Sequence, residues 1–287
     1  MSPARILSDR EEEILVRVRR ALGDARLVLE KAGVEERDAL FFDSSVHRLD
    51  ELFLLVVVGE FNSGKSAFIN ALLGKTLLEE GVTPTTARIT IVRHGKEERR
   101  QRTDDGFDLV EAPFPVLDPI ELVDTPGTNA ITREHEAITR DFIPRSDLVL
   151  FVTSADRPFT ESERVFLESI RDWGKKVLLV VNKVDILTRE EDVREVEGFV
   201  RENAAKLLGS APEVFSVSSK EAMRAKASNN PELLSRSRFA RLEGHIASVL
   251  DDRERVRLKL LNPLGVGLSL AAKYHEIALS VLELLED

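Results

Sequence analysis

Hydrophobic and polar positions divide the chain into a central region of short apolar runs and two flanking regions with helical periodicity. Near the amino end, Ser8 opens an S-x-x-E capping box, and apolar residues then recur at helical spacing as far as Gly33. A second helical pattern covers about residues 35–49. These patterns predict two amphipathic helices ahead of the central region.

Short apolar runs in the central region predict strands that are buried on both faces. The first, Phe53–Val58, is rich in β-branched residues and does not alternate with polar ones. Similar runs follow at Ala87–Val92, Ile120–Val123, Leu148–Val152, Val177–Val181 and Val214–Val217. Helical patterns separate most of them, which is typical of an α/β domain with a mainly parallel sheet sandwiched by helices. We assign this domain to residues 52–225.

A polar break, Lys226–Arg238, follows the central region and contains an Asn-Pro step. Beyond it, apolar residues fall at alternating three- and four-residue steps, with Arg253 in the one slot that breaks the seam. The members of this seam are Phe239, Leu242, Ile246, Val249, Val256 and Leu260. Pro263 and Gly265 are expected to interrupt a second helical stretch. Neither flank has a core of its own, so residues 1–51 and 226–287 are predicted to form one small helical bundle.

Composition and charge narrow the classes of protein that fit. The 287 residues are 43% hydrophobic and 32% charged, as in a soluble globular protein. The net charge of −10 argues against a general nucleic-acid binder. The absence of cysteine rules out disulfides and fits a reducing, intracellular compartment. No secretory signal is expected, because the opening "MSPARILSDREEE" has no apolar core behind its basic start. No membrane span is expected either, because the most apolar long window, Leu260–Leu285, contains several charges.

The stretch Gly59–Ser66 matches the phosphate-binding pattern G-x-x-x-x-G-K-[ST] between a strand and a helix. The loop amides and helix N-terminus are expected to face phosphates, Lys65 to reach the β- and γ-oxygens, and Ser66 to bind Mg²⁺. Asn62 is the loop residue polar enough to contact the transferring charge, and is a candidate only. The predicted phosphate-binding residues are Gly59, Asn62, Ser63, Gly64, Lys65, Ser66 and Ala67.

Asp124-Thr125-Pro126-Gly127 follows a predicted strand. An acid at this place supplies a second, water-mediated contact to Mg²⁺, and the Gly127 amide can sense the γ-phosphate. A threonine between the two motifs is also needed to complete the Mg²⁺ shell and hold the attacking water. Thr83, Thr85 and Thr86 compete for this role, and Thr86 is favoured because it lies nearest the next strand. The predicted metal ligands are Ser66, Thr86 and Asp124, and the predicted catalytic residues are Lys65, Thr86, Asn62 and Gly127.

Asn182-Lys183-Val184-Asp185 follows another strand and selects guanine. The Asp185 carboxylate can accept from the N1–H and N2-amino edge of guanine, which adenine does not offer, while Asn182 can reach N7 and the Lys183 stem can lie over the base. The later loop Ser218-Ser219-Lys220 resembles one whose backbone contacts the guanine, although a polar loop capping a helix is nearly as good a reading. The expected ligands are therefore GTP or GDP with Mg²⁺.

Thr128 stands where many GTPases carry a water-orienting glutamine. A threonine cannot reach the same position. Intrinsic hydrolysis is therefore expected to be slow, or to be completed by the phosphate loop, by the threonine segment or by a second molecule.

Together these segments resemble the GTPase domain of dynamin-like proteins, in the fuzzy-onion-like group of bacteria and plastids that is related to mitofusins. The resemblance rests on "GEFNSGKSAFINALLG", "GVTPTTARIT", "LVDTPGTNAI", "FIPRSDLVLFVTSADRPFTESERVFLESI" and "NKVDIL". It implies GTP hydrolysis by two GTPase domains that face each other across their nucleotides, flanking helices that relay nucleotide state, and membrane remodelling or fusion by the full-length protein. The resemblance also implies that the full-length protein acts at a plastid, thylakoid or bacterial inner membrane.

The resemblance also has a departure, because the family's long stalk and membrane-inserting segment have no counterpart in this sequence. We therefore expect a minimal, soluble GTPase-domain piece that hydrolyses GTP and forms a homodimer without fusing membranes by itself. Two alternatives share the motif order. A ribosome- or RNA-associated GTPase predicts a basic appendage, and a regulatory GTP-binding switch predicts a monomer with every nucleotide.

Overall fold

The computed structural model describes residues 9–47, 49, 51–81, 88–104, 106–118, 120–126 and 142–286. In this part of the chain an eight-stranded sheet forms the centre, with the order β3-β4-β2-β5-β1-β6-β7-β8. The strands are β1 (Phe53–Val58), β2 (Thr90–His94), β3 (Arg99–Arg102), β4 (Asp108–Ala112), β5 (Ile120–Asp124), β6 (Leu148–Ser154), β7 (Val177–Asn182) and β8 (Glu213–Ser216). β1, β6 and β7 are buried throughout, as their unalternating apolar sequences predict.

The sheet is mostly parallel with an antiparallel edge, and this confirms the predicted fold class. β1 pairs in parallel with both β5 and β6, and β6, β7 and β8 continue the parallel order. β2 runs antiparallel to β5, and β3 antiparallel to β4. The parallel arrangement brings the carboxyl ends of β1, β5, β6 and β7 to one edge, which is where ligands bind in open α/β sheets.

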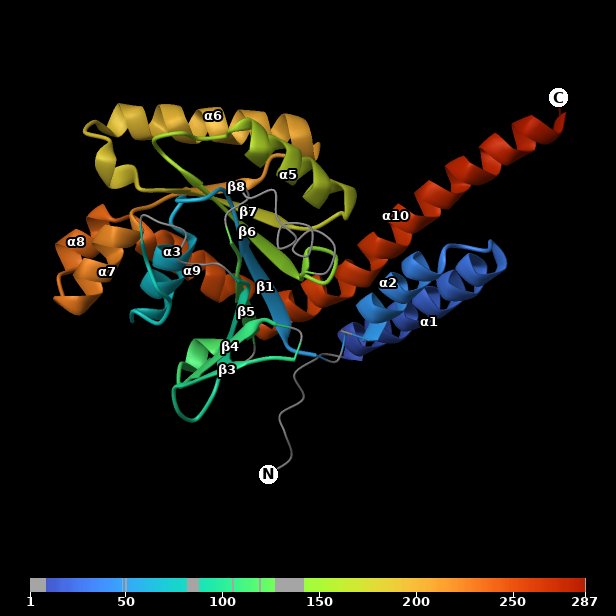
Figure 1. Cartoon of the computed structure of the whole chain (residues 1–287), viewed down its shortest axis with the longest axis horizontal. Helices are drawn as coiled ribbons and strands as arrows, with labels where there is room; N and C mark the ends of the chain where they lie inside the picture. Colours follow the sequence, from blue (N-terminus) through green and yellow to red (C-terminus); the bar gives the residue numbers. More distant parts are fainter. Residues whose placement is uncertain are drawn as a thin grey trace.

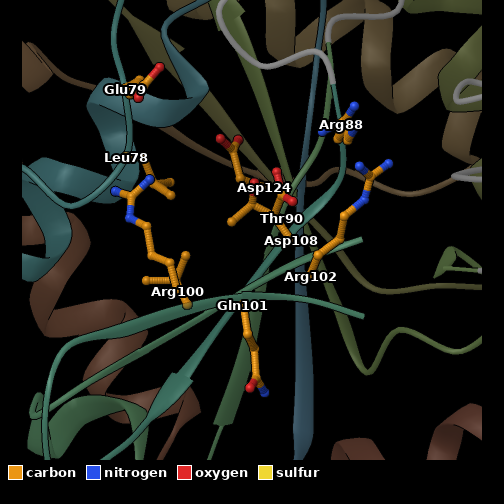
Figure 2. A pocket seen from close by; sticks show the side chains of 10 residues that line it. Leu78, Glu79, Arg88, Thr90, Arg100, Gln101, Arg102, Asp108 and Asp124 are labelled. Carbon is orange, nitrogen blue, oxygen red and sulfur yellow. The ribbon is translucent and has the colours of Figure 1, made fainter. Parts of the chain in front are cut away.

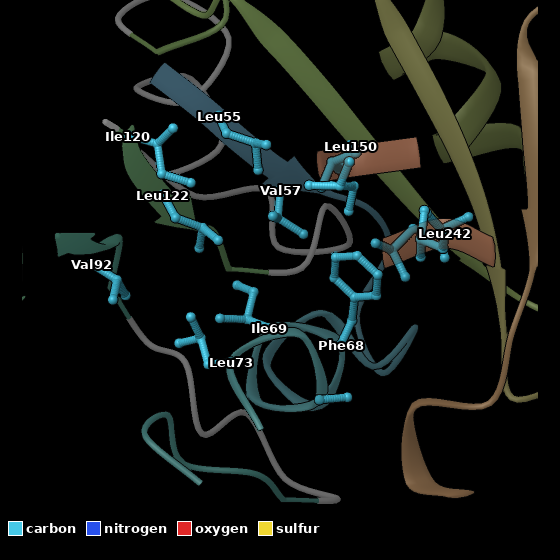
Figure 3. Packing of buried hydrophobic residues seen from close by; sticks show 14 of the residues in the cluster. Leu55, Val57, Phe68, Ile69, Leu73, Val92, Ile120, Leu122, Leu150 and Leu242 are labelled. Carbon is cyan, nitrogen blue, oxygen red and sulfur yellow. The ribbon is translucent and has the colours of Figure 1, made fainter. Parts of the chain in front are cut away.

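Helices cover both faces of the sheet (Figure 1). One face carries α5 (Glu161–Asp172) and α6 (Glu190–Leu208). The other carries α3 (Lys65–Leu73), α7 (Ser219–Ala227), α8 (Pro231–Arg236) and α9 (Phe239–Val249). Figure 3 shows Phe68, Ile69 and Leu73 of α3 pointing toward the apolar side chains of the strands. The short 3₁₀ helices Pro115–Leu117 and Val184–Ile186 complete the domain.

α1 (Asp9–Lys31) and α2 (Glu36–His47) form a hairpin that lies alongside the long helix α10 (Asp252–Glu286) (Figure 1). Leu22, Phe42, Val266 and Leu270 are among the residues of their shared apolar core. A polar tie adds to it, because Asp38 of α2 accepts hydrogen bonds from Lys273 and Tyr274 of α10, both at 2.7 Å. None of the described helices offers a stretch that is long and apolar enough to cross a bilayer.

The seam predicted for the carboxyl-terminal bundle divides between two packing environments. Phe239, Leu242, Ile246 and Val249 of α9 lie in the same core as the strands and α3. The helix then ends, and α10 begins at Asp252, beside the Arg253 slot that breaks the periodicity. Packing therefore places α9 with the sheet, and the described bundle contains α1, α2 and α10. A spacing of three and four residues predicts a buried helix face but does not identify the surface that covers it.

Pro263 does not interrupt the carboxyl-terminal helix, contrary to the sequence prediction, and α10 continues through it and Gly265. Tertiary packing offsets the lost backbone hydrogen bond, since Val266 and Leu270 on the next turns are buried against the hairpin. The run Glu97–Arg102 contains the exposed edge strand β3, which pairs with β4. Neither β3 nor β4 was expected as a strand, because β3 has no apolar residue and two acidic residues interrupt the short apolar pattern of β4.

Candidate active site

The loop between β1 and α3 turns sharply under two glycines at the carboxyl edge of the sheet. Gly59 has φ +149°, and a Cβ there would lie 2.0 Å from the Val152 carbonyl oxygen. Gly64 has φ +88°, and a Cβ there would lie 2.4 Å from the Asn182 amide nitrogen. Both positions therefore require glycine for conformation and for close approach. The loop enters α3 directly, so the free amides of its first turn, with Ser66 and Ala67, face the same space.

Lys65 is a buried cation at the start of α3. Its ammonium donates to the carbonyl oxygens of Gly59, at 3.1 Å, and Glu60, at 2.9 Å. Burial lowers the pKa of Lys65 to about 8, against the opposing fields of Asp124, Glu163 and Glu60. A polyphosphate bound in the loop would supply a negative charge next to the Lys65 ammonium and so offset the cost of burying it.

Asp124 ends β5 directly opposite Ser66. The Ser66 hydroxyl donates to Asp124 Oδ2 at 2.7 Å, and burial raises the pKa of Asp124 to about 6 in spite of Lys65 and Ser66. Among the described residues, Asp124 Oδ1 is buried without a hydrogen-bond partner. A buried, unpaired carboxylate oxygen beside a hydroxyl fits a hard divalent cation such as Mg²⁺, which prefers oxygen ligands and retains water. These residues therefore fit the predicted metal.

A hollow of about 420 Å³ opens beside Asp124. In Figure 2, Asp124 and Thr90 lie between Leu78 and Glu79 on one side and Arg88 and Arg102 on the other. The hollow is therefore shared by the loop after α3 and by the β2–β4 edge of the sheet. Thr90 itself pairs with Asp124 across β2 and β5, so the two walls meet at the acid.

Asn182, which the sequence analysis expects to reach guanine N7, joins two loops of the site. Its side-chain amide donates to the carbonyl oxygens of Ser63, at 3.0 Å, and Gly64, at 3.3 Å. Its side-chain oxygen accepts from the Ser219 amide, at 3.1 Å, and hydroxyl, at 2.9 Å. One buried side chain thus joins the phosphate loop to the loop after β8, and all of its hydrogen-bonding groups are used.

Asp185 is exposed at the other end of the site, where the base would bind. The Ser218 hydroxyl donates to Asp185 Oδ1 at 2.6 Å and accepts from the Glu221 amide at 3.1 Å, so it orients the carboxylate while capping α7. Sequence reasoning gave Ser218 a backbone role, and its side-chain role has no separate sequence signal. Lys183 adopts a left-handed conformation with φ +65°. Lys220 lies exposed on α7.

The sequence analysis assigned no role to two buried carboxylates, Glu60 within the phosphate loop and Glu163 on α5. Thr160 donates to Glu60 at 3.0 Å, and Glu163 accepts from the Thr153 hydroxyl, at 2.9 Å, and from the Thr160 amide, at 3.0 Å. Burial raises the pKa of Glu163 to about 7, and Glu60 adds to the shift. The capping box Thr160–Glu163 was the available signal, although it gives no hint of the nearby loop.

Several predicted residues lie outside the described part of the chain. These are the candidate threonines Thr83, Thr85 and Thr86, together with Gly127 and Thr128. Of the predicted residues within it, Gly59, Ser63, Gly64, Lys65, Ser66, Ala67, Asp124 and Asn182 come together at one edge of the sheet. Asn62 is exposed on the loop, with φ +60°.

The strand-to-helix phosphate loop, the Asp124–Ser66 pair and the exposed Asp185 define a P-loop GTPase. A family model described as a 50S ribosome-binding GTPase matches residues 54–183. A probable transmembrane GTPase, FZO-like and chloroplastic, from Arabidopsis thaliana is 38% identical over 286 residues, which cover 91% of this chain and 31% of that protein. A bacterial dynamin-like protein from Nostoc punctiforme is 30% identical over 190 residues, covering 51% of this chain and 27% of the relative.

Among solved structures, this chain is similar to one from an oligomerised bacterial dynamin pair, which is described as a mechanism for long-range sensing and tethering of membranes. The TM-score is 0.62 and the sequence identity is 19%. The match covers 98% of this chain and 49% of that chain, and shows a shared fold. The chain is similar to dynamin-like GTPases, and over 91% of its length to a relative of the FZO-like type. It spans about a third of the length of the FZO-like relative.

Proposed function

We propose that this chain binds GTP with Mg²⁺ and hydrolyses it as the catalytic part of a membrane-remodelling protein. The observation that carries the proposal is that a cationic and an anionic side chain are both buried at the phosphate end of the site. Lys65 and Asp124 both have pKa values displaced by burial toward their neutral forms. A phosphate beside Lys65 and a cation beside Asp124 would each supply the missing counter-charge.

The proposed roles follow the geometry. Lys65 and the loop amides bind the β- and γ-phosphates, and Gly127 donates to the γ-phosphate. Ser66, Asp124 and Thr86 would hold Mg²⁺, which when bound neutralises charge on the phosphate oxygens. Asp185, oriented by Ser218, accepts from the guanine edge, and Lys183 covers the base. Ser219 and Lys220 support the base loop, and Asn62 is the loop candidate for contacting the transferring phosphoryl group.

We further infer that two copies pair through their GTPase domains when GTP is bound. Support comes from Thr128, which stands where many GTPases have a water-orienting glutamine, and from the similarity to dynamin-like relatives. A group from the second copy would complete each site. The membrane would be engaged by parts of a longer protein, given that this chain covers 31% of the FZO-like relative.

The matching family model is described as a ribosome-binding GTPase, which would favour a ribosome-associated function. The matched residues 54–183, however, cover only the GTPase core. Similarity to the FZO-like relative extends over 91% of the chain, including flanking helices. Those helices are amphipathic and the chain has a net charge of −10, which disfavours an RNA-binding appendage. The dynamin-like function therefore accounts for more of the molecule.

The proposal is tested by measuring GTP turnover and GDP affinity of the chain, of two site variants and of one control variant. Lys65→Ala should lose turnover by about two orders of magnitude or more, because the phosphates lose their cation. Thr86→Ala should keep GDP affinity and lose turnover. Lys206→Ala, which removes an exposed ammonium paired with Glu202 on α6, is the control. Wild-type turnover in Lys65→Ala would contradict the assigned site. Normal turnover in Thr86→Ala would instead assign the binding of Mg²⁺ and the attacking water to Thr83 or Thr85.

A further inference from the structure

Asn70 lies on α3 and is fully buried, with none of its surface exposed. Its side-chain oxygen accepts from the amides of Leu77, at 2.9 Å, and Leu78, at 2.8 Å. Its side-chain nitrogen donates to the Leu78 carbonyl oxygen, at 2.8 Å, and to a carboxylate oxygen of Glu80, at 2.6 Å. Both acceptor sites and both donor hydrogens are used, so this amide has one orientation and holds the segment Leu77–Glu80 in one place.

The hydrogen bonds between Asn70 and the segment Leu77–Glu80, called the clamp below, start from the helix that carries the candidate metal ligand Ser66. Asn70 follows Ser66 by four residues, so the two side chains lie on the same face of α3, one turn apart. Ser66 donates to Asp124 at 2.7 Å. A rigid helical turn therefore sets the distance between the Ser66–Asp124 pair and the segment that Asn70 holds.

The held segment forms one wall of the hollow beside Asp124. Leu78 and Glu79 line that hollow, and Figure 2 shows them across from Arg88 and Arg102. Arg100 of β3 donates to the Leu77 carbonyl oxygen from the other side. The wall is thus fixed from the helix by Asn70 and from the sheet edge by Arg100, close to the acid that would face the metal.

We propose that Asn70 is a positioning residue for the γ-phosphate and metal end of the site, acting by fixing Leu77–Glu80 relative to Ser66. This inference rests on the proposed GTP-dependent function. The clamped segment supplies Leu78 and Glu79 to the hollow beside Asp124, so its position sets the shape of the site at the metal end.

Loss of the clamp would let this wall shift relative to Asp124, and a small misplacement at the reacting end of a site lowers turnover severalfold or more. GDP, which lacks the γ-phosphate, should not be affected.

The experiment compares GTP turnover, and the affinities for GDP and for a non-hydrolysable GTP analogue with Mg²⁺, in four proteins. Asn70→Asp keeps the acceptor for Leu77 and Leu78 but loses both donations and opposes Glu80. Glu80→Ala removes one bond at an exposed residue and leaves the buried amide in place. Lys75→Ala, on the same loop, removes only an exposed pair with Glu98 and is the control.

We expect Asn70→Asp to lose at least about threefold in kcat and in the analogue-to-GDP affinity ratio, with a KM for GTP that rises in step with the weaker analogue binding and an unchanged GDP affinity. Glu80→Ala should lose less, and Lys75→Ala nothing. An unchanged affinity ratio and kcat in a folded Asn70→Asp would overturn the inference. If that variant does not fold, wild-type values in Glu80→Ala would overturn it. A wild-type chain without GTP turnover would refute the proposed function, and the affinity ratio would still decide the role of Asn70.

Discussion

At the scale of single residues, several polar side chains of the site form hydrogen bonds that position the loops and side chains expected to bind the ligand. Asn182 uses its amide between the phosphate loop and Ser219, and Ser218 orients Asp185. The groups expected to meet the ligand are Lys65 and Asp124 at the phosphate end and Asp185 at the base end. Because their supports are buried and satisfied, the part of the site that lies in the described residues is formed without a nucleotide.

Asp185 gives the most specific prediction at this scale. Asp185→Asn replaces a carboxylate, which accepts from the N1–H and N2-amino groups of guanine, with an amide that also donates. We expect affinity for GDP to fall by about tenfold or more and affinity for xanthosine diphosphate, which has an oxygen at position 2, to rise. Competition binding with GDP, ADP and the xanthine nucleotide measures both changes. An unchanged preference for guanine would refute the assigned base contact.

Glu163 predicts a pH dependence of folding stability. Its pKa is raised by burial to about 7 from a reference value of 4.5, so the folded state keeps a proton that the unfolded state releases between these values. Stability should therefore fall as pH rises from about 4.5 to about 7. Glu163→Gln keeps an oxygen acceptor for Thr153 and Thr160 and cannot ionise, so it should lack this component.

Urea unfolding of wild type and Glu163→Gln between pH 5 and 8 measures the difference. The variant's advantage in free energy of unfolding should grow with pH up to about 7 and then stay constant. Glu161→Gln is the matched control on the same turn, because Arg164 lowers the pKa of Glu161 and the side chain is exposed. Parallel pH curves for wild type and Glu163→Gln would show that Glu163 is ionised in the folded protein.

At the scale of elements, α9 belongs energetically to the sheet. Leu242 is fully buried among strand residues and α3, whereas Leu268 of α10 is 73% exposed. Leu242→Ala should lower the free energy of unfolding of the nucleotide-binding domain by about 2–5 kcal/mol, and Leu268→Ala should have little effect. Denaturation monitored with and without GDP measures both. Equal, small effects would mean that α9 does not complete this core.

The elements also show how far sequence patterns extend. Long apolar runs predicted β1, β6 and β7 to within one or two residues, because a strand buried on both faces needs no alternation. β3 could not be predicted, since its residues are Arg99–Arg102 and its pairing with β4 is made by the backbone. The continuation of α10 through Pro263 depends on packing against α1 and α2, which residues far apart in sequence supply.

The same limit applies to the site. Motif spacing brought Lys65, Ser66 and Asp124 together correctly, because each motif follows a strand that ends at the same edge of a parallel sheet. The bracing role of Asn182 and the clamp by Asn70 depend on loops whose paths no local pattern specifies. Side chains that bind a ligand are thus easier to predict than the side chains that support them.

At the scale of the whole molecule, α10 joins the GTPase domain to the helical flank. Asn262 on α10 donates to the Arg145 carbonyl oxygen and to Asp147 Oδ1, both at 3.3 Å, and its side-chain oxygen accepts from Lys175 of the GTPase domain. Further along, the same helix packs against α1 and α2. One continuous helix therefore contacts both the domain that binds nucleotide and the bundle.

The central claim is that two GTPase domains pair to complete hydrolysis. Its most direct test is the mass of the chain in solution by light scattering, measured without nucleotide, with GDP, with a non-hydrolysable GTP analogue, and with GDP, aluminium fluoride and Mg²⁺. We predict the monomer mass of 32.2 kDa in the first two conditions and a doubled mass with the transition-state mimic. A monomer in all four conditions, together with turnover per molecule that does not rise with protein concentration, would contradict the account.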